Sequence, residues 1–258
     1  MTEMQKHSSR YKKSLGQHFL NSKGLAKKIV DFAEIENEIV LEIGSGKGIL
    51  TRQIAQGAKK VFAVEIDKKL AQVLERMNLL NIIIINNDFL KLDLKNYQNP
   101  VIVGNIPYSI TTRIFEKLIE QRDCFKRAVL TIQKEYGQRI LANVNSRQYG
   151  VITLYVNYYY QINKAFVIQS RCFSPQPKVS SVVISLTRKK PRFALKNDKA
   201  FFEFIKGIFC YRRKSLKNAL ISHLHELPEH IDKKLLGKRP QNLALNDFYR
   251  IYKKLVLA

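Results

Sequence analysis

The chain has 258 residues, of which 45% are hydrophobic, so it suits one large domain or a large domain with a small one. The three cysteines, Cys124, Cys172 and Cys210, have no CxxC spacing, which argues against a disulfide framework or a zinc site and fits a reducing cytoplasm. No N-terminal run resembles a signal peptide, and no apolar stretch of about 20 residues is present that would span a bilayer.

Charge is the most prominent global feature. Lys and Arg number 45 against 21 Asp and Glu, a formal net charge of +24. Residues 188–258 hold 18 basic and 6 acidic residues, so half of the net charge falls in this short segment. A polyanionic partner is expected, and nucleic acid is favoured over a membrane because no basic amphipathic helix with a broad apolar face is evident. The alternative is a general basic bias of the proteome.

Short apolar runs alternate with helical patterns along most of the chain. Buried strands are predicted at 38–44, 61–67, 82–86, 100–105, 127–133, 150–160 and 180–188, and helices at 49–56, 68–77 and 111–121. Continuously apolar strands separated by helices predict a parallel sheet covered on both faces. After "KKPR" the composition changes, and helical patterns fill 199–224 and 243–257. We therefore predict an α/β domain over 1–189 and a small basic helical domain over 190–258.

The stretch "LEIGSGKGILT" places Gly44, Gly46 and Gly48 between the first predicted strand and a helix. A nucleoside-triphosphate loop is excluded, because Leu41 and Gly48 stand where that motif needs glycine and a hydroxyl residue. A dinucleotide GxGxxG motif fails at Ile49. The remaining GxGxG pattern lets a ligand approach the backbone at the switch point of an open sheet, and the alternative is a tight strand–helix turn.

Acidic residues end the next two predicted strands. Glu65, followed by Ile66, lies about 20 residues beyond the glycines, where a carboxylate can accept both hydroxyls of a ribose. Asp88, followed by Phe89, ends the third strand and can accept a hydrogen bond from an adenine amine. Each acid alone is commonplace, but at successive strand ends of one sheet they converge on one crevice. The pattern resembles the S-adenosylmethionine site of a Rossmann-like methyltransferase.

The fourth predicted strand runs into Asn105, Ile106, Pro107 and Tyr108. Pro107 fixes its own φ and pushes Ile106 out of helical geometry, so this backbone is stiff and extended. The exocyclic amine of a base is a poor nucleophile, because its lone pair is delocalised into the ring. The Asn105 side-chain oxygen and the Ile106 carbonyl can accept its two N–H groups and favour the pyramidal nitrogen of the transition state, while Tyr108 stacks on the base. The alternative is a structural turn.

Nine segments are similar, in order, to the KsgA/Erm family of ribosomal RNA adenine dimethyltransferases. They are "LGQHFLNS", "LEIGSGKGILT", "VEID", "NNDFLKLD", "GNIPYSIT", "IQKEYGQRI", "YGVITLYVNYY", "FSPQPKVSSVVISL" and "YRRKSLKNAL". The resemblance covers about residues 12 to 250. It implies a Rossmann-like, S-adenosylmethionine-dependent methyltransferase sheet with a small C-terminal all-helical domain.

The resemblance also implies site residues. Phe173 would face the target base opposite Tyr108, so that two rings hold a flipped adenine. The family's cofactor positions carry over to His18, Leu20, Gly44, Glu65, Asp88 and Asn105. The family usually has Asn where His18 stands.

The segments "RRKSLKNAL", "QKEYGQRI" and "RPQNLALNDF" favour the KsgA branch. Enzymes of this branch dimethylate two adjacent adenines near the 3′ end of small-subunit rRNA during subunit biogenesis. We expect a monomeric cytoplasmic enzyme acting on rRNA of the small subunit or its precursor, with no metal. The alternatives are Erm-type methylation of one large-subunit adenine, which gives antibiotic resistance, and a non-catalytic RNA-binding assembly factor. Contacts to RNA are predicted for Lys12, Lys13, Lys178, Arg212, Arg213, Lys214 and Lys217.

Overall fold

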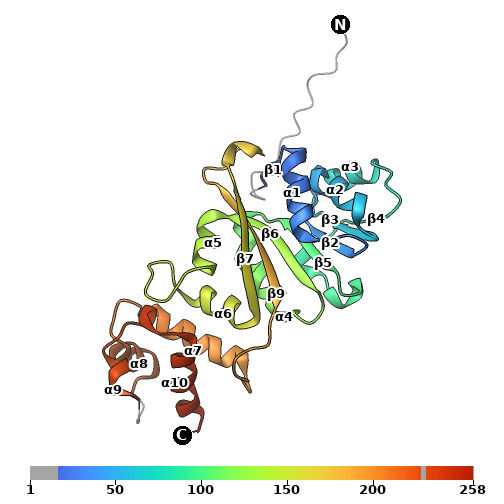
Figure 1. Cartoon of the computed structure of the whole chain (residues 1–258). Helices are drawn as coiled ribbons and strands as arrows, with labels where there is room; N and C mark the ends of the chain where they lie inside the picture. Colours follow the sequence, from blue (N-terminus) through green and yellow to red (C-terminus); the bar gives the residue numbers. More distant parts are fainter. Residues whose placement is uncertain (1–16, 228–230, 258) are drawn as a thin grey trace. The chain divides into compact units, whose positions relative to one another are not determined.

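The computed structural model describes residues 17–227 and 231–257 (Figure 1). Its main element is a seven-stranded sheet in the order β4-β3-β2-β5-β6-β9-β7. The strands are β2 (Ile39–Ile43), β3 (Lys60–Val64), β4 (Ile82–Ile85), β5 (Val101–Asn105), β6 (Arg127–Gln133), β7 (Tyr160–Ile168) and β9 (Ser181–Arg188). Strands β2 to β6 are parallel and β9 is antiparallel to β6. A separate pair, β1 (Phe19–Leu20) and β8 (Phe173–Ser174), is antiparallel.

The order of the sheet creates a switch point between β2 and β5. The chain leaves β2 toward β3 and β4 on one side, and β5 pairs with the opposite edge of β2. Ligands of open α/β sheets bind at the carboxyl ends of the strands beside such a point. The predicted α/β fold class is confirmed, but the sheet is not wholly parallel as expected, because β9 runs antiparallel to β6.

Helices connect and follow these strands. They are α1 (Lys23–Ala33), α2 (Ile49–Gly57), α3 (Lys68–Glu75), α4 (Thr111–Glu120), α5 (Lys134–Ile140), α6 (Val151–Tyr159), α7 (Asp198–Cys210), α8 (Leu216–Leu224), α9 (Lys233–Leu236) and α10 (Leu245–Leu257). Short 3₁₀ turns are η2 (Phe89–Lys91), η3 (Leu94–Tyr97), η4 (Tyr108–Ile110), η5 (Ser170–Cys172) and η6 (Pro240–Asn242).

The contacts divide the chain into two compact units. The first runs to Lys134 and resumes over Asn163–Thr187, and the second comprises Glu135–Ile162 and the chain from Arg188. The second unit thus contains the helical C-terminal segment together with α6 and most of α5.

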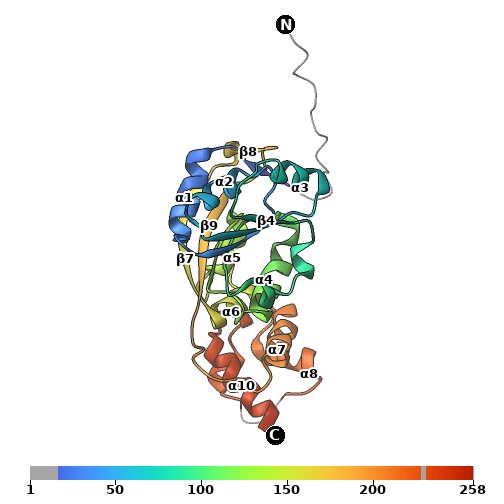
Figure 2. The ribbon, with the colours of Figure 1, turned by 90° about the vertical axis from the view of Figure 1, so that its right-hand side faces the viewer.

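The core of the first unit explains why its strands are continuously apolar. Val101 and Val103 of β5 belong to one buried cluster with Ile29 of α1 and Ile54 of α2. Ile102 alternates to the other face of the sheet and is equally buried. Helices α1 and α2 lie side by side in both views (Figure 1 and Figure 2). Burial on both faces removes the apolar–polar alternation of a half-exposed strand.

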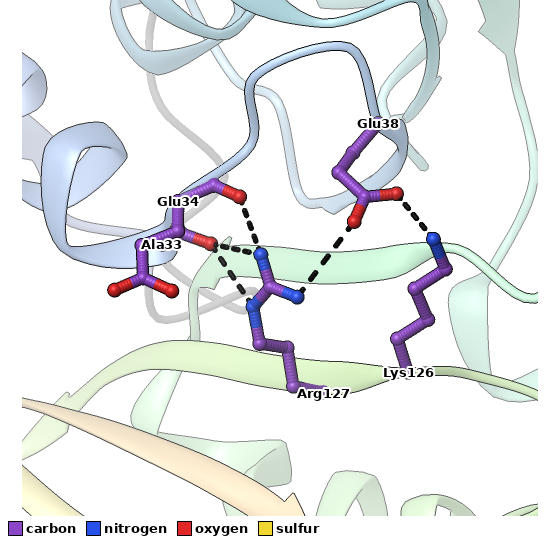
Figure 3. A network of polar contacts seen from close by, with 5 residues as sticks. All are labelled: Ala33, Glu34, Glu38, Lys126 and Arg127. Carbon is purple, nitrogen blue, oxygen red and sulfur yellow. Dashed lines mark hydrogen bonds and ion pairs between the residues drawn. The ribbon is translucent and has the colours of Figure 1, made fainter.

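A polar network fastens the end of α1 to the sheet (Figure 3). Arg127 at the start of β6 donates to the Ala33 carbonyl from Nε at 3.2 Å and from Nη2 at 2.9 Å, and also to the Glu34 carbonyl. Glu38 accepts from Lys126 Nζ at 2.5 Å and lies 3.8 Å from Arg127 Nη1. A cation at a helix C-terminus satisfies its last carbonyls and complements its dipole. The network therefore fixes α1, which follows the segment 17–22 of the site.

One predicted element is wrong. Residues 150–160 were expected as a strand, but they form α6, and the strand β7 begins only at Tyr160. Thr153 Oγ1 accepts from the Gly150 N–H at 3.1 Å at the start of α6, and no residue of the helix is exposed. Because no face of α6 is fully exposed, its apolar residues show no period that would distinguish a helix from a strand. The helical pattern at 199–224 also divides, into α7 and α8.

Candidate active site

A cavity of about 270 Å³ lies at the carboxyl ends of β2, β3 and β5, beside the switch point. The structure brings most of the predicted site residues to its wall. They are His18, Gly44, Glu65, Ile66, Asp88, Phe89, Asn105, Ile106, Pro107 and Tyr108. The loops that follow β2, β3, β4 and β5 therefore converge, as expected for strand ends of one sheet, and the segment that contains His18 joins them.

Glu65 is the most buried acid of the cavity wall, with only 2% of its surface exposed. Its Oε2 accepts the Gly46 N–H at 2.8 Å, and its Oε1 accepts the Asp67 N–H at 2.8 Å. Burial is the main cause that raises the pKa of Glu65. Each oxygen keeps a further lone pair, so the carboxylate can accept two neighbouring hydroxyls.

The glycine loop leaves room in front of this carboxylate. Gly44 has φ +69°, a conformation that L side chains rarely adopt, and a Cβ at this position would meet no atom within 4 Å. Gly44 therefore opens its backbone to the cavity. Gly46 does not line the cavity, and a Cβ there would lie 2.8 Å from the ring of Phe19, which does line it. Gly48 is the N-cap of α2 and also lies outside the cavity wall.

The loop after β4 presents Asp88 and Phe89. Asp88 Oδ1 accepts the Leu90 N–H at 2.9 Å, which leaves Oδ2 for an external donor. Lys117 of α4 stabilises this loop, because its Nζ donates to the carbonyl of Leu90 at 3.2 Å and to the carbonyl of Leu92. Lys117 is 8% exposed, and burial lowers its pKa.

Two residues of this site were not predicted from the sequence, Lys117 and Arg113, and Arg113 lines the cavity from the first turn of α4. The sequence does contain an indication for Lys117. It stands between Ile114 and Leu118 at helical spacing, so a lysine occupies the core-facing side of an amphipathic helix.

Asn105 is the last residue of β5, and the nitrogen of its side-chain amide is already hydrogen-bonded within the protein. Its Nδ2 donates to the His18 carbonyl at 2.7 Å, so Oδ1 is the atom that remains to accept a hydrogen bond at the cavity. The following backbone is fixed by the Ile106 N–H, which donates to the Thr131 carbonyl at 2.9 Å. An acceptor is thus held at the strand end without freedom to rotate away.

Tyr108 lines the cavity with its hydroxyl anchored. The Tyr108 Oη and Ser181 Oγ are 2.8 Å apart, and burial raises the pKa of Tyr108. The His18 ring lies 5.4 Å from the Tyr108 ring, measured between centroids. His18 Nδ1 donates to the Pro175 carbonyl at 2.7 Å, which fixes the orientation of the imidazole.

The structure does not bring Phe173 to the cavity. The antiparallel pairing of β1 with β8 sets Leu20 opposite Phe173, and both side chains join the buried core cluster that contains Ala26 and Ile29. Phe173 is only 3% exposed. Of the two rings expected around a base, only Tyr108 lines the cavity, and the ring beside it is that of His18. Leu20 likewise contributes to the core and not to the cavity wall.

The predicted RNA contacts have different surroundings. Lys178 is exposed in the first unit, and Arg213, Lys214 and Lys217 are exposed in the second. Arg212 is partly buried, and its Nη2 donates to the Arg147 carbonyl and to Gln241 Oε1, both at 3.0 Å. Arg212 therefore links segments of the second unit. Lys12 and Lys13 lie outside the described residues.

Among the described residues, no group of three or more His, Cys, Asp and Glu side chains can hold a metal ion. No helix within residues 17–227 and 231–257 has the length and apolar character needed to cross a membrane.

The sheet order, the glycine loop and the acids at successive strand ends define a Rossmann-like methyltransferase. A solved dimethyladenosine transferase from Plasmodium falciparum has a TM-score of 0.78 at 29% identity, covering 92% of this chain and 98% of that one. The 23S rRNA methyltransferase ErmE shares the fold, with a TM-score of 0.72 at 24% identity over 92% of this chain and 99% of its own.

Residues 8–256 match the family described as ribosomal RNA adenine dimethylase, and the chain belongs to this family. Two curated relatives are both called ribosomal RNA small subunit methyltransferase A. The Clostridium acetobutylicum protein is 41% identical over 225 residues, covering 84% of this chain and 82% of the relative. The Mycoplasmopsis pulmonis protein is 39% identical over 255 residues, covering 95% and 99%. The family predicted from the sequence is confirmed.

Proposed function

We propose that the protein transfers methyl groups from S-adenosylmethionine to the exocyclic amines of two adjacent adenines near the 3′ end of small-subunit rRNA. The observation that carries the proposal is the fixed acceptor Asn105 Oδ1, which faces the same cavity as Glu65 and Gly44. The names of the curated relatives support the small subunit as the target. ErmE, at 24% identity, supports the fold alone, so the large-subunit alternative has no such support.

The cavity residues fit the methyl donor. S-adenosylmethionine would supply an electrophilic methyl group on a sulfonium, whose departing sulfur takes the bonding electrons. Glu65 would accept its two ribose hydroxyls, because both carboxylate oxygens retain a lone pair. Asp88 Oδ2 would accept the adenine amine of the donor, and Gly44 leaves space for close approach to the backbone.

Asn105 would act on the acceptor amine. Its Oδ1 and the Ile106 carbonyl would accept the two N–H groups as the nitrogen becomes tetrahedral, which localises the lone pair that attacks the methyl group. These hydrogen bonds strengthen in the transition state relative to the ground state, so they accelerate transfer rather than merely bind substrate. A general base is unnecessary, because the methylated amine is acidic enough to release its proton to water.

Tyr108 would hold the target base in line with the methyl group. Its hydroxyl is engaged with Ser181, so the orientation of the ring is set from β9 before the base arrives. Preorganised stacking lowers the cost of orienting the acceptor.

The rRNA partner would be held by the basic surface that gives the chain its net charge of +24. The substrate would be the small subunit or its precursor, and the protein would act as a monomer in the cytoplasm, where ribosomes assemble.

The test is methyl transfer from labelled donor to purified small subunits, large subunits and naked rRNAs, followed by mapping of the modified base. We expect label on two adjacent adenines of the small-subunit rRNA. Label on a single large-subunit adenine would establish the Erm-type alternative. Absence of transfer to any of these RNAs, together with tight RNA binding, would establish a non-catalytic assembly factor.

A further inference from the structure

The second unit contains a cavity of about 500 Å³ that methyl transfer does not use. Its wall comes from the segment between α5 and α6, from α6 itself, from residues 189–193 and from the start of α10. A volume of this size is typical of sites for small organic ligands or for one unit of a polymer.

Two cations line this cavity, and the nearest acid identified is Asp247, whose Oδ2 accepts the N–H of the lining residue Ala244 at 2.9 Å. Lys189 and Arg192 are three positions apart and both are exposed, and the described residues of the cavity wall include no Asp or Glu. The Lys189 N–H donates to the Tyr159 carbonyl at 2.9 Å, which fixes the backbone that carries the pair. Partial desolvation of its ammonium group, together with the charge of Arg192, lowers the pKa of Lys189. An anion bound here would offset the repulsion between two like charges.

A hydrogen-bond acceptor is held on the same wall. Asn157 of α6 lines the cavity, and its Nδ2 donates to the Ile140 carbonyl at 2.9 Å and to the Thr153 carbonyl at 2.8 Å. Both hydrogens of the amide are therefore used inside the protein. The atom that Asn157 can offer to an occupant is Oδ1, an acceptor.

Aromatic rings form an apolar part of the wall. Phe193 lines the cavity and stacks on Tyr249 with 3.9 Å between ring centroids and an interplanar angle of 16°. Tyr158 lies 5.3 Å from Phe193, and its hydroxyl donates to the Phe193 carbonyl at 2.7 Å. These contacts make the aromatic wall rigid, as a planar ligand requires.

We propose that this cavity binds one unpaired nucleotide of an RNA, with its phosphate at Lys189 and Arg192 and the exocyclic amine of its base at Asn157 Oδ1. Cations, an oriented acceptor and an aromatic wall match the three parts of a nucleotide. The choice of RNA as the source of the nucleotide rests on the proposed function.

Calorimetry with the full chain tests the ligand class, using cytidine monophosphate, uridine monophosphate and inorganic phosphate as probes. Cytosine has an amine where uracil has a carbonyl, so an acceptor at Asn157 discriminates between them. We expect cytidine monophosphate to bind roughly three- to ten-fold more tightly than uridine monophosphate, the worth of one hydrogen bond, and more tightly than phosphate. Equal affinities for the two nucleotides, or for phosphate and nucleotide, would overturn the proposal.

Matched double variants test the position of the site. Replacing Lys189 and Arg192 with Gln should weaken binding of cytidine monophosphate by about ten-fold or more. Replacing Lys190 and Lys196 with Gln removes the same charge from exposed residues of the same segment that lie outside the cavity wall, and should leave affinity unchanged. Equal losses in the two variants would show that only the general field of the protein acts. Ala142→Trp fills the cavity at constant charge and should also abolish binding.

A cytidine decamer tests whether the nucleotide belongs to an RNA chain. The decamer should bind more tightly than cytidine monophosphate, and it should lose affinity in the Lys189/Arg192 variant but not in the Lys190/Lys196 variant. A decamer that binds more weakly than the mononucleotide, or that is indifferent to the cavity variant, would contradict the proposal. None of these measurements uses methyl transfer, so failure here and failure of the proposed methylation are separately visible.

Discussion

Removing the Glu65 carboxylate should weaken binding of S-adenosylmethionine by a predictable amount. The two oxygens of Glu65 each accept one backbone N–H at 2.8 Å, from Gly46 and Asp67, and each can accept one ribose hydroxyl in addition. A hydrogen bond to a charged acceptor is worth about 1.5–3 kcal/mol. Glu65→Ala should therefore raise the dissociation constant by roughly ten- to hundred-fold even if water replaces part of the interaction.

The assay is calorimetric titration of S-adenosylmethionine into wild type and Glu65→Ala. Glu75→Ala is the matched control, because it removes the same charge from an exposed residue at the end of α3. Glu65 also holds the Gly46 N–H, so urea unfolding must show that each variant is folded at the titration temperature. Unchanged affinity in a folded Glu65→Ala protein would refute the assignment of this carboxylate to the ribose.

Three further predictions concern stability, stacking and RNA. Glu42 of β2 is 1% exposed, and its Oε2 accepts from Thr51 Oγ1 at 2.6 Å. Burial raises the pKa of Glu42 from 4.5 to about 7, so ionisation of Glu42 in the folded state lowers stability by about 3 kcal/mol in total as pH rises through this window. Relative to wild type, Glu42→Gln should gain that amount in urea unfolding between pH 4 and pH 8, and a gain independent of pH would exclude the buried charge as its cause. Tyr108→Ala should weaken RNA binding and methylation, since stacking contributes about 1–3 kcal/mol per base. Tyr108→Phe keeps the ring and should have only a small effect on both. Equal losses in the two variants would mean that the Tyr108 hydroxyl, which is hydrogen-bonded to Ser181, is essential. Neutralising Arg213, Lys214 and Lys217 should lower the salt dependence of RNA binding by a slope of about 2 in a log–log plot, and an unchanged slope would place the RNA elsewhere.

The positions of β2 to β6 and of β9 could be predicted from local sequence, and the cavity could be predicted because the carboxyl ends of parallel strands meet at one edge of the sheet. A parallel strand buried on both faces is a continuous apolar run in the sequence, so the polar residue that follows the run can be identified as the end of the strand. Glu65 and Asn105 were identified in this way. The segment 150–160 could not be assigned, because no face of α6 is fully exposed and its apolar residues therefore show no period that distinguishes a helix from a strand.

Other features depend on residues that are far apart in the chain. The burial of Phe173 follows from its pairing with Leu20, and no local pattern of either segment predicts that register. The hydrogen bond between Tyr108 and Ser181 likewise joins residues that lie 73 positions apart in the chain. Lys117 is the exception, since a lysine on the core-facing side of an amphipathic helix is visible in the sequence itself.

Single-turnover methylation by Asn105→Ala, with saturating donor and alongside equilibrium RNA binding, tests the central claim most directly. Asn105 Oδ1 is placed to accept from the amine as the nitrogen becomes tetrahedral, so the variant should lose far more in the rate of transfer than in RNA affinity. Because Nδ2 also holds the His18 carbonyl, Asn105→Asp serves as the companion variant, keeping an acceptor and losing that donor. We expect Asn105→Ala to be slower than Asn105→Asp, with RNA binding near wild type in both. A near wild-type rate in Asn105→Ala would contradict the account, and the strand end would then be a structural turn.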